Sequence, residues 1–157
     1  MSRSGVEIRE ADWIDLILLI PRLRKADIAE CEALFGKGSL SKIAADTFTH
    51  STVRFAVAVD GVVIAMFGMT VHSMLGGLGH PWMFGTPAIE KALRRALMTE
   101  ARGYISDMLR LCPRLENVVD SRNLKSIRWL QRMGFTVQPA VPMGVAGVPF
   151  HPFVMEV

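Results

Sequence analysis

The chain has 157 residues, half of them apolar, and a formal net charge of +3 at pH 7. That length predicts one domain over residues 1–157, large enough to bury an apolar core without disulfides or structural metals. The composition excludes a disordered chain, and so small a positive charge gives no reason to expect nucleic acid as a partner. Cys31 and Cys112 lie far apart and lack a metal-ligand or CxxC spacing, so we expect free thiols and no metal site.

The N-terminal residues predict a short strand followed by a helix. Val6 and Ile8 alternate with charged residues, as in a strand, and Asp12 is a candidate N-cap. Pro21 kinks or restarts the helix that follows. The apolar run 16–20 is too short to cross a bilayer and no signal-peptide pattern precedes it, so we expect a cytoplasmic protein with no membrane partner.

Two further helices are expected before the main strands. The segment 22–36 reads as one helix that continues to a C-cap at Gly36. Its apolar positions are small and sparse, so this helix either packs closely or lies half exposed. A shorter helix is expected over 39–48, with Ser39 as candidate N-cap.

The clearest strand signal is a pair of apolar runs, 55–59 and 62–67, that flank Asp60-Gly61. Asp-Gly between two such runs is typical of a type I′ hairpin turn. Because both runs are apolar at nearly every position, we expect helices on both faces of the sheet. A glycine-rich loop leads from this hairpin to another expected strand over 81–85.

One long helix is expected next, with Thr86 as its N-cap, Pro87 in its first turn and Pro113 at its end. The stretch 116–137 then predicts a strand over 116–120, a turn, a helix over 124–133 and a second strand. A Pro/Gly/Val loop over 139–149 and a closing strand over 150–157 complete the order. This order fits one mixed sheet with helices on both faces.

The helix over 124–133 carries two distinct stripes. Lys125, Arg128 and Arg132 are three and four residues apart, so they form a basic stripe beside an apolar one. Gly134 suits the left-handed residue that ends a helix, and Phe135 stands where a Schellman cap places an apolar residue.

This unit resembles a known family. Asn123, Ser126, Ile127 and the pair Gly134-Phe135 are similar to the C-terminal motif of the GNAT acyltransferases. The order of the expected elements is also similar to the GNAT fold. The resemblance therefore implies an α/β fold, GNAT-like, with a mixed, mostly antiparallel central sheet and helices on both faces.

In that family, acyl-CoA lies between the fourth and fifth strands, which correspond here to 81–85 and 116–120. The resemblance implies acetyl-CoA or another acyl-CoA as cofactor and an amine as acceptor. It also implies a set of cofactor-binding residues: Met83 and Phe84 on the strand, Gly85 and Thr86 in the turn that follows, and Asn123 beside the pantetheine.

The sequence departs from the family in that turn and on the last helix. Pro87 has no N–H, no glycines follow it, and Glu90 adds a negative charge where a pyrophosphate would lie. Leu130 stands where the family often has a tyrosine as general acid. His80, beside the glycine-rich loop, is the candidate catalytic base, with a structural or exposed histidine as the alternative.

A second, narrower resemblance runs through most of the chain. The short stretches that carry it are 24–27 with Glu30, Trp82 before 85–87, 117–123, 127–130 and 134–135. They are similar to GNAT-like internal virion or assembly proteins of short-tailed phages and prophages. This resemblance implies, as the alternative to an enzyme, a structural protein without catalysis. Such a protein would have phage assembly proteins as partners and would be packaged in a phage particle. Whether the protein is an enzyme or a structural protein, the sequence leaves open whether it forms a homo-oligomer.

Overall fold

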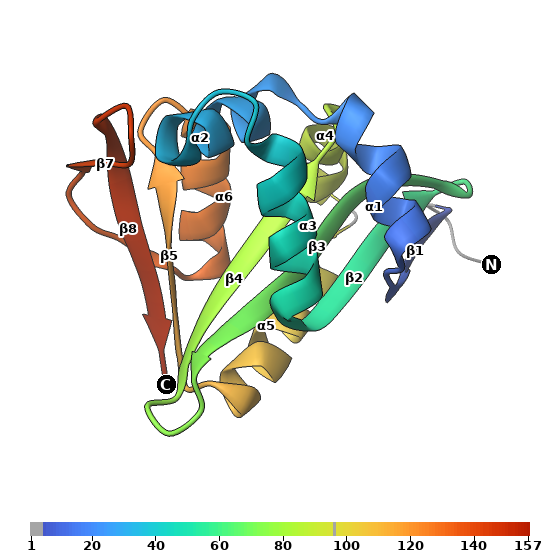
Figure 1. The fold of residues 1–157 in the computed structure, drawn as a ribbon. Helices are drawn as coiled ribbons and strands as arrows, with labels where there is room; N and C mark the ends of the chain where they lie inside the picture. The colour runs from blue at the N-terminus through green and yellow to red at the C-terminus, as the bar shows by residue number, and fades with distance from the viewer. Residues whose placement is uncertain (1–4, 96) are drawn as a thin grey trace.

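The computed structural model describes residues 5–95 and 97–157, which form one eight-stranded sheet with helices packed on it (Figure 1). The strands are β1 Val6–Glu10, β2 Ser51–Val59, β3 Val62–Ser73, β4 Leu78–Gly85, β5 Arg114–Asp120, β6 Thr136–Val137, β7 Val141–Met143 and β8 Val148–Glu156. The helices are α1 Trp13–Leu19, α2 Lys25–Phe35, α3 Leu40–His50, α4 Ala88–Arg95, α5 Met98–Leu111 and α6 Leu124–Met133, with a 3₁₀ turn over Ile20–Arg22.

The sheet has the order β1-β2-β3-β4-β5-β8-β6, and β7 pairs with β8. All neighbouring strands are antiparallel except β4 and β5, which are parallel. The expected fold class, a mixed and mostly antiparallel sheet with helices, is therefore confirmed.

Helices cover both faces of the sheet, as the apolar runs of the hairpin predict. Ala56 and Met66 pack with α1 and α3 on one face, whereas Val57 and Ala65 pack with α4 on the other. Figure 1 shows α1 and α3 crossing in front of β2 and β3, with α5 behind the sheet. The central residues of these strands therefore face helices on one side of the sheet or the other, which explains why the strands lack the alternation of a half-exposed sheet.

Two turns form as their residues predict. Asp60 and Gly61 both have positive φ, 50° and 81°, as a type I′ turn requires. Gly134, with φ 104°, ends α6 in the left-handed conformation. The N–H of Phe135 donates to the carbonyl of Leu130 at 3.0 Å, which is the longer bond of a Schellman cap.

Among the N-terminal helices, α1 begins as expected and α2 begins later than expected. Asp12 caps α1 as predicted, since its carboxylate accepts from the N–H of Asp15 at 3.0 Å. The expected helix over 22–36 is wrong at its start: α2 begins at Lys25, because Arg24 is extended and its N–H donates to the carbonyl of Gly85 at 2.9 Å. Ser39 makes no side-chain cap; its hydroxyl donates to the carbonyl of Gly36 at 2.6 Å.

The expected single helix after Pro87 is instead two helices, α4 and α5. Leu97 precedes α5 and is buried against Ile89 and Val57, so the chain turns there to reach the core. Residue 96 lies outside the described residues. The hydroxyl of Thr86 donates to the carbonyl of Ile64 on β3 at 3.0 Å, which ties this end of β4 to its neighbour.

The expected loop over 139–149 contains a strand, and the last strand begins two residues before its predicted start. β7 and β8 form a hairpin whose turn lies against the end of α2. The N–H groups of Val145 and Ala146 donate to the carbonyls of Leu34 and Ala33 at 3.2 and 3.1 Å. The turn thus satisfies carbonyls that the helix itself leaves without a partner. Among the described residues, no helix is long and apolar enough to span a membrane.

Candidate functional site

β4 and β5 part almost as soon as they meet. Their parallel pairing is limited to Leu78 with Arg114 and Gly79 with Leu115. Beyond these pairs the two strands diverge toward their carboxyl ends, as Figure 1 shows. A cavity of about 330 Å³ is lined by residues from both strands and from the helices on each face.

Side chains bridge the two strands where they part. The imidazole Nδ1 of His80 lies 2.8 Å from the carbonyl of Glu116, and the side-chain amide of Asn117 donates to the carbonyl of Pro81 at 2.8 Å. Because a carbonyl only accepts, Nδ1 of His80 carries the proton in this contact. The other ring nitrogen, Nε2, is then the acceptor of the neutral imidazole.

One amide of β4 faces the gap between the strands. Successive residues of an antiparallel strand direct their backbone groups to opposite sides. Gly85 and Pro81 both make hydrogen bonds on the side away from β3, so Met83 between them faces the gap as well, whereas Phe84 faces β3. Since β5 pairs with β4 only at Leu78 and Gly79, it offers the N–H of Met83 no acceptor.

α2 closes the far end of the gap with two carboxylates. Asp27 accepts from the N–H of Gly85, the last residue of β4, at 2.7 Å. Glu30 accepts from the N–H of Asp120, the last residue of β5, at 3.0 Å. The two acids are three residues apart and so lie on the same face of α2, one for each strand.

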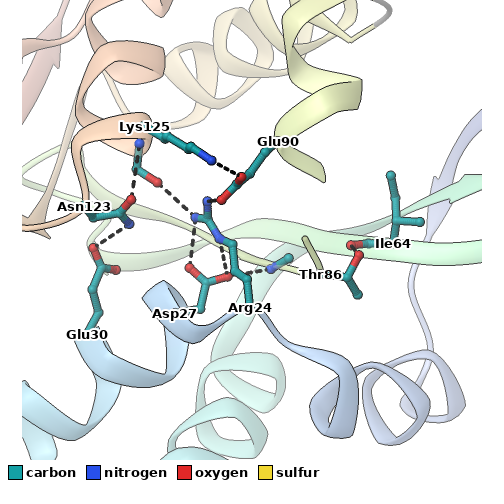
Figure 2. A network of polar contacts seen from close by, with 10 residues as sticks. Arg24, Asp27, Glu30, Ile64, Thr86, Glu90, Asn123 and Lys125 are labelled. Carbon is teal, nitrogen blue, oxygen red and sulfur yellow. Dashed lines mark hydrogen bonds and ion pairs between the residues drawn. The ribbon is translucent and has the colours of Figure 1, made fainter. Parts of the chain in front are cut away.

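Arg24 joins three helices at this point, as Figure 2 shows. Its guanidinium holds Asp27 with two bonds of 3.0 Å and donates to the hydroxyl of Ser126 on α6 at 2.9 Å. Its third contact is Glu90 on α4, at 3.6 Å. The Arg24 side chain is only 6% exposed, so these partners replace nearly all of its hydration.

Glu30 has no such cation in contact. Burial of its carboxyl raises the pKa of Glu30 from 4.5 to about 7, although bonds from Asn123 and from the Asp120 N–H oppose the rise. A role for Glu30 at this site is not predicted from the sequence. The available signal was the three-residue spacing of Asp27 and Glu30, which puts two acids on one face of α2.

Asn123 lies at the site, but its polar groups are engaged within the chain. Its side-chain oxygen accepts from the N–H of Ser126 at 3.3 Å, which caps α6. Its side-chain NH₂ donates to Glu30 at 3.1 Å. Asn123 therefore joins the start of α6 to the middle of α2.

The turn between β4 and α4 offers few amides. The N–H of Gly85 donates to Asp27, the N–H of Thr86 donates to the carbonyl of Ile64 at 2.9 Å, and Pro87 has none. Glu90 follows in the first turn of α4. A pyrophosphate needs several N–H groups in one place, so this turn does not fit one.

The remaining candidates lie in different surroundings. His80 is half-buried, and its ring lies 5.2 Å from that of His72 at an interplanar angle of 60°. Leu130 is buried in the core under α6. Tyr104 of α5 packs against Phe55 of β2 and Phe67 of β3. Among the described residues, no group of three or more His, Cys, Asp and Glu side chains could hold a metal ion.

The gap and the turn therefore differ in what they could accept. The gap has an unpaired amide on a strand edge and an apolar cavity, which suit an extended chain with amide groups such as pantetheine. The turn lacks the donors for the phosphates that follow pantetheine in CoA. Acyl-CoA thus fits the gap, and the turn cannot supply its ordinary phosphate contacts.

No known family model matches the sequence, and no curated protein matches it. Solved structures share its fold over nearly the whole chain. A spermidine N-acetyltransferase from Vibrio cholerae, in complex with CoA and spermine, has a TM-score of 0.70 at 15% identity, with 97% of this chain and 95% of that chain covered. A GCN5-related N-acetyltransferase from Kribbella flavida has a TM-score of 0.69 at 14% identity, with 98% of each chain covered.

The third structure, AAC(6′)-Ib with ribostamycin and CoA, has a TM-score of 0.66 at 16% identity, with 97% of this chain and 93% of that chain covered. Identities this low reflect a common fold and leave the activity open. The gap between the fourth and fifth strands, the order of the sheet and these three structures lead to one conclusion. The chain has the fold of the GNAT N-acetyltransferases.

Proposed function

We propose that the protein transfers an acyl group from acyl-CoA to an amine. One observation carries this proposal: β4 and β5 part after two residue pairs and leave the N–H of Met83 facing a cavity between them. A strand edge inside a protein normally has its backbone groups paired, so an unpaired one in a cavity is suited to a ligand. When bound there, acyl-CoA would supply an acyl group activated as a thioester.

The N–H of Met83 is proposed to donate to the carbonyl oxygen that gains negative charge during transfer. It is held in place by the pairing of β4 with β3, so it needs no rearrangement to donate. A fixed donor in a site that excludes water stabilises such charge more than water does. Phe84, Gly85, Thr86 and Asn123 would then shape the gap around the ligand.

His80 is proposed as the base that accepts a proton from the amine. Its Nδ1–H is committed to the carbonyl of Glu116, so its Nε2 has the free lone pair that a base needs. The same hydrogen bond fixes the orientation of the ring. Replacing His80 with Gln would therefore lower the rate of transfer with little change in acyl-CoA affinity.

The test is calorimetric titration of acetyl-CoA into the protein, together with thiol release in the presence of a panel of amines. Met83→Pro removes the proposed donor, and Met83→Ala controls for loss of the side chain. Proline is suited to this position because Pro81 already occupies an equivalent one on the same edge of β4. We expect transfer in wild type and in Met83→Ala, and a loss of about a hundredfold in Met83→Pro.

A second candidate is a virion or assembly protein of phage type that keeps the fold without catalysis. The specific observation in its favour is the turn after β4, where Asp27 and Ile64 take the N–H groups of Gly85 and Thr86. Its partners would be phage assembly proteins. No heat from acetyl-CoA and no thiol release, in a sample that unfolds cooperatively, would favour this candidate over the enzyme.

A further inference from the structure

A basic groove lies between α4 and α6, next to the gap between β4 and β5. It has a volume of about 370 Å³. Its lining comprises Arg24, Glu90, Lys125, Ser126, Arg128, Trp129 and Arg132. Four of these residues are cations and one is an acid, and the three cations on α6 form one stripe along the helix. The charge of the groove therefore favours an anionic ligand.

Glu90 already places one anion in this groove. Its carboxylate accepts from Nζ of Lys125 at 2.6 Å and lies 3.6 Å from the guanidinium of Arg24 (Figure 2). The hydrogen bond from Lys125 lowers the pKa of Glu90, so this carboxylate is charged at neutral pH. Because Glu90 and Lys125 are both partly solvent-exposed, the cost of separating them is small.

Trp129 supplies a second, independent observation. Its indole N–H is buried and has no hydrogen-bond partner within the described residues. A buried donor without a partner costs free energy, so it is commonly explained by a group that binds there. Trp129 lines both the groove and the cavity between the strands, so its side chain forms part of the wall that the two share.

We propose that the groove binds the phosphates of a polyphosphate-bearing ligand and that Glu90 is an internal carboxylate which those phosphates displace. Lys125 and Arg24 would exchange the single charge of Glu90 for the larger charge of the ligand, and Arg128 would add a further contact. The assignment to CoA rests on the function proposed above. In that case the stripe on α6 replaces the turn after β4 as the phosphate site.

The experiment is calorimetric titration of the full chain with inorganic pyrophosphate, CoA and S-acetylpantetheine, which has the thioester but no phosphate. Arg128→Gln removes a cation that lines the groove, and Lys91→Gln is its matched control: an exposed residue next to Glu90 that does not line the groove. We expect Arg128→Gln to weaken pyrophosphate and CoA about tenfold and Lys91→Gln to weaken them less than about twofold. Glu90→Gln should strengthen both severalfold.

Pyrophosphate and CoA affinities that are unchanged in Arg128→Gln, or that fall in Glu90→Gln, would overturn the groove as the phosphate site. So would the absence of any binding of pyrophosphate and CoA by both wild type and Glu90→Gln. Measuring acyl transfer from S-acetylpantetheine distinguishes failure of the proposed phosphate site from failure of the proposed enzyme activity. If the protein transfers the acyl group of S-acetylpantetheine but Arg128 has no role in CoA binding, the groove is rejected and the enzyme is not. If pyrophosphate binding needs Arg128 but no acyl transfer occurs, the enzyme is rejected and the groove is not.

Discussion

The protein has two strand-to-helix junctions side by side, and they are closed in different ways. At the end of β4, the carboxylate of Asp27 accepts from Gly85 and is neutralised by Arg24. At the end of β5, the carboxylate of Glu30 accepts from Asp120 but is contacted by the uncharged amide of Asn123. The same helix, α2, supplies both acids.

The two junctions therefore differ in the charge balance of their carboxylates. At the end of β4, the guanidinium of Arg24 balances the charge of Asp27 through two hydrogen bonds of 3.0 Å. A buried carboxylate without a cation titrates near neutral pH. The β5 junction is therefore expected to respond to pH.

The largest effect on the difference between the two junctions is expected when the cation at the β4 junction is removed. Arg24→Met leaves Asp27, whose side chain is 4% exposed, buried without its counter-charge. Loss of one partner from a buried pair costs about 3–5 kcal/mol of the free energy of unfolding. Urea denaturation measures this loss.

The control for Arg24→Met is Arg110→Met, which breaks a pair between two exposed side chains on α5. We expect that change to cost less than about 1 kcal/mol. Equal losses in the two variants would mean that the Arg24–Asp27 pair does not hold the end of β4.

Glu30→Gln tests the other junction. The pKa of Glu30 is raised from 4.5 to about 7 in the folded protein, so the folded state binds more protons than the unfolded state between these values. Wild type should therefore lose stability as the pH rises from about 4.5 to 7, by up to roughly 3 kcal/mol. Glutamine keeps the acceptor oxygen and cannot ionise, so the variant should lack this loss.

Thermal unfolding of wild type and Glu30→Gln at pH 5 and pH 8 gives the measurement. The variant should be the more stable of the two at pH 8, and the difference should shrink at pH 5. A constant difference at both pH values would contradict a titrating Glu30.

Gly144→Ala tests whether α2 needs its support from the β7–β8 turn. Gly144 has φ +72°, and a Cβ there would come within 2.5 Å of Cα of Leu34 at the end of α2. We expect a loss of about 2 kcal/mol or more in urea denaturation. Gly147 is the control: φ is +64° but nothing lies within 4 Å of its Cβ position, so Gly147→Ala should cost only about 1 kcal/mol.

The smallest expected effect comes from Asn123. Asn123→Ala removes the cap of α6 and the contact with Glu30, at a cost of about 1 kcal/mol in thermal or urea denaturation. Asn123→Ser keeps a capping oxygen and removes only the contact. A serine variant as unstable as the alanine variant would mean that the bond to Glu30, and not the cap, provides the stability.

The sequence predicted the elements whose cause is local. Asp60-Gly61 sets a turn by its own backbone preferences, and the pattern that starts at Asn123 and stops at Gly134 sets the bounds of α6. Arg24 was misassigned to a helix because its conformation depends on Gly85, a residue 61 positions away. Leu97 was misassigned for a similar reason, since its burial against the sheet interrupts a helix that local periodicity would continue.

The parting of β4 and β5 was predicted, but the contacts within the gap were not. The resemblance pointed to the space between two strands, and β4 and β5 do part there. The positions of Asp27 and Glu30 on the strand ends could not be predicted, because their partners lie 58 and 90 residues further along the chain. Spacing within α2 shows that the acids share a face, but it does not show what that face covers.

Because of the two carboxylates on α2, hydrogen exchange at the amides of Gly85 and Asp120 depends on the position of a helix. Most amides in a sheet are protected from hydrogen exchange by a neighbouring strand, whereas these two are protected by side chains of a helix. Their exchange rates therefore report whether α2 is seated on the strand ends, while amides such as that of Met66 report the sheet itself. A ligand that displaces α2 would speed up exchange at two positions far apart in sequence and leave the central strands unchanged.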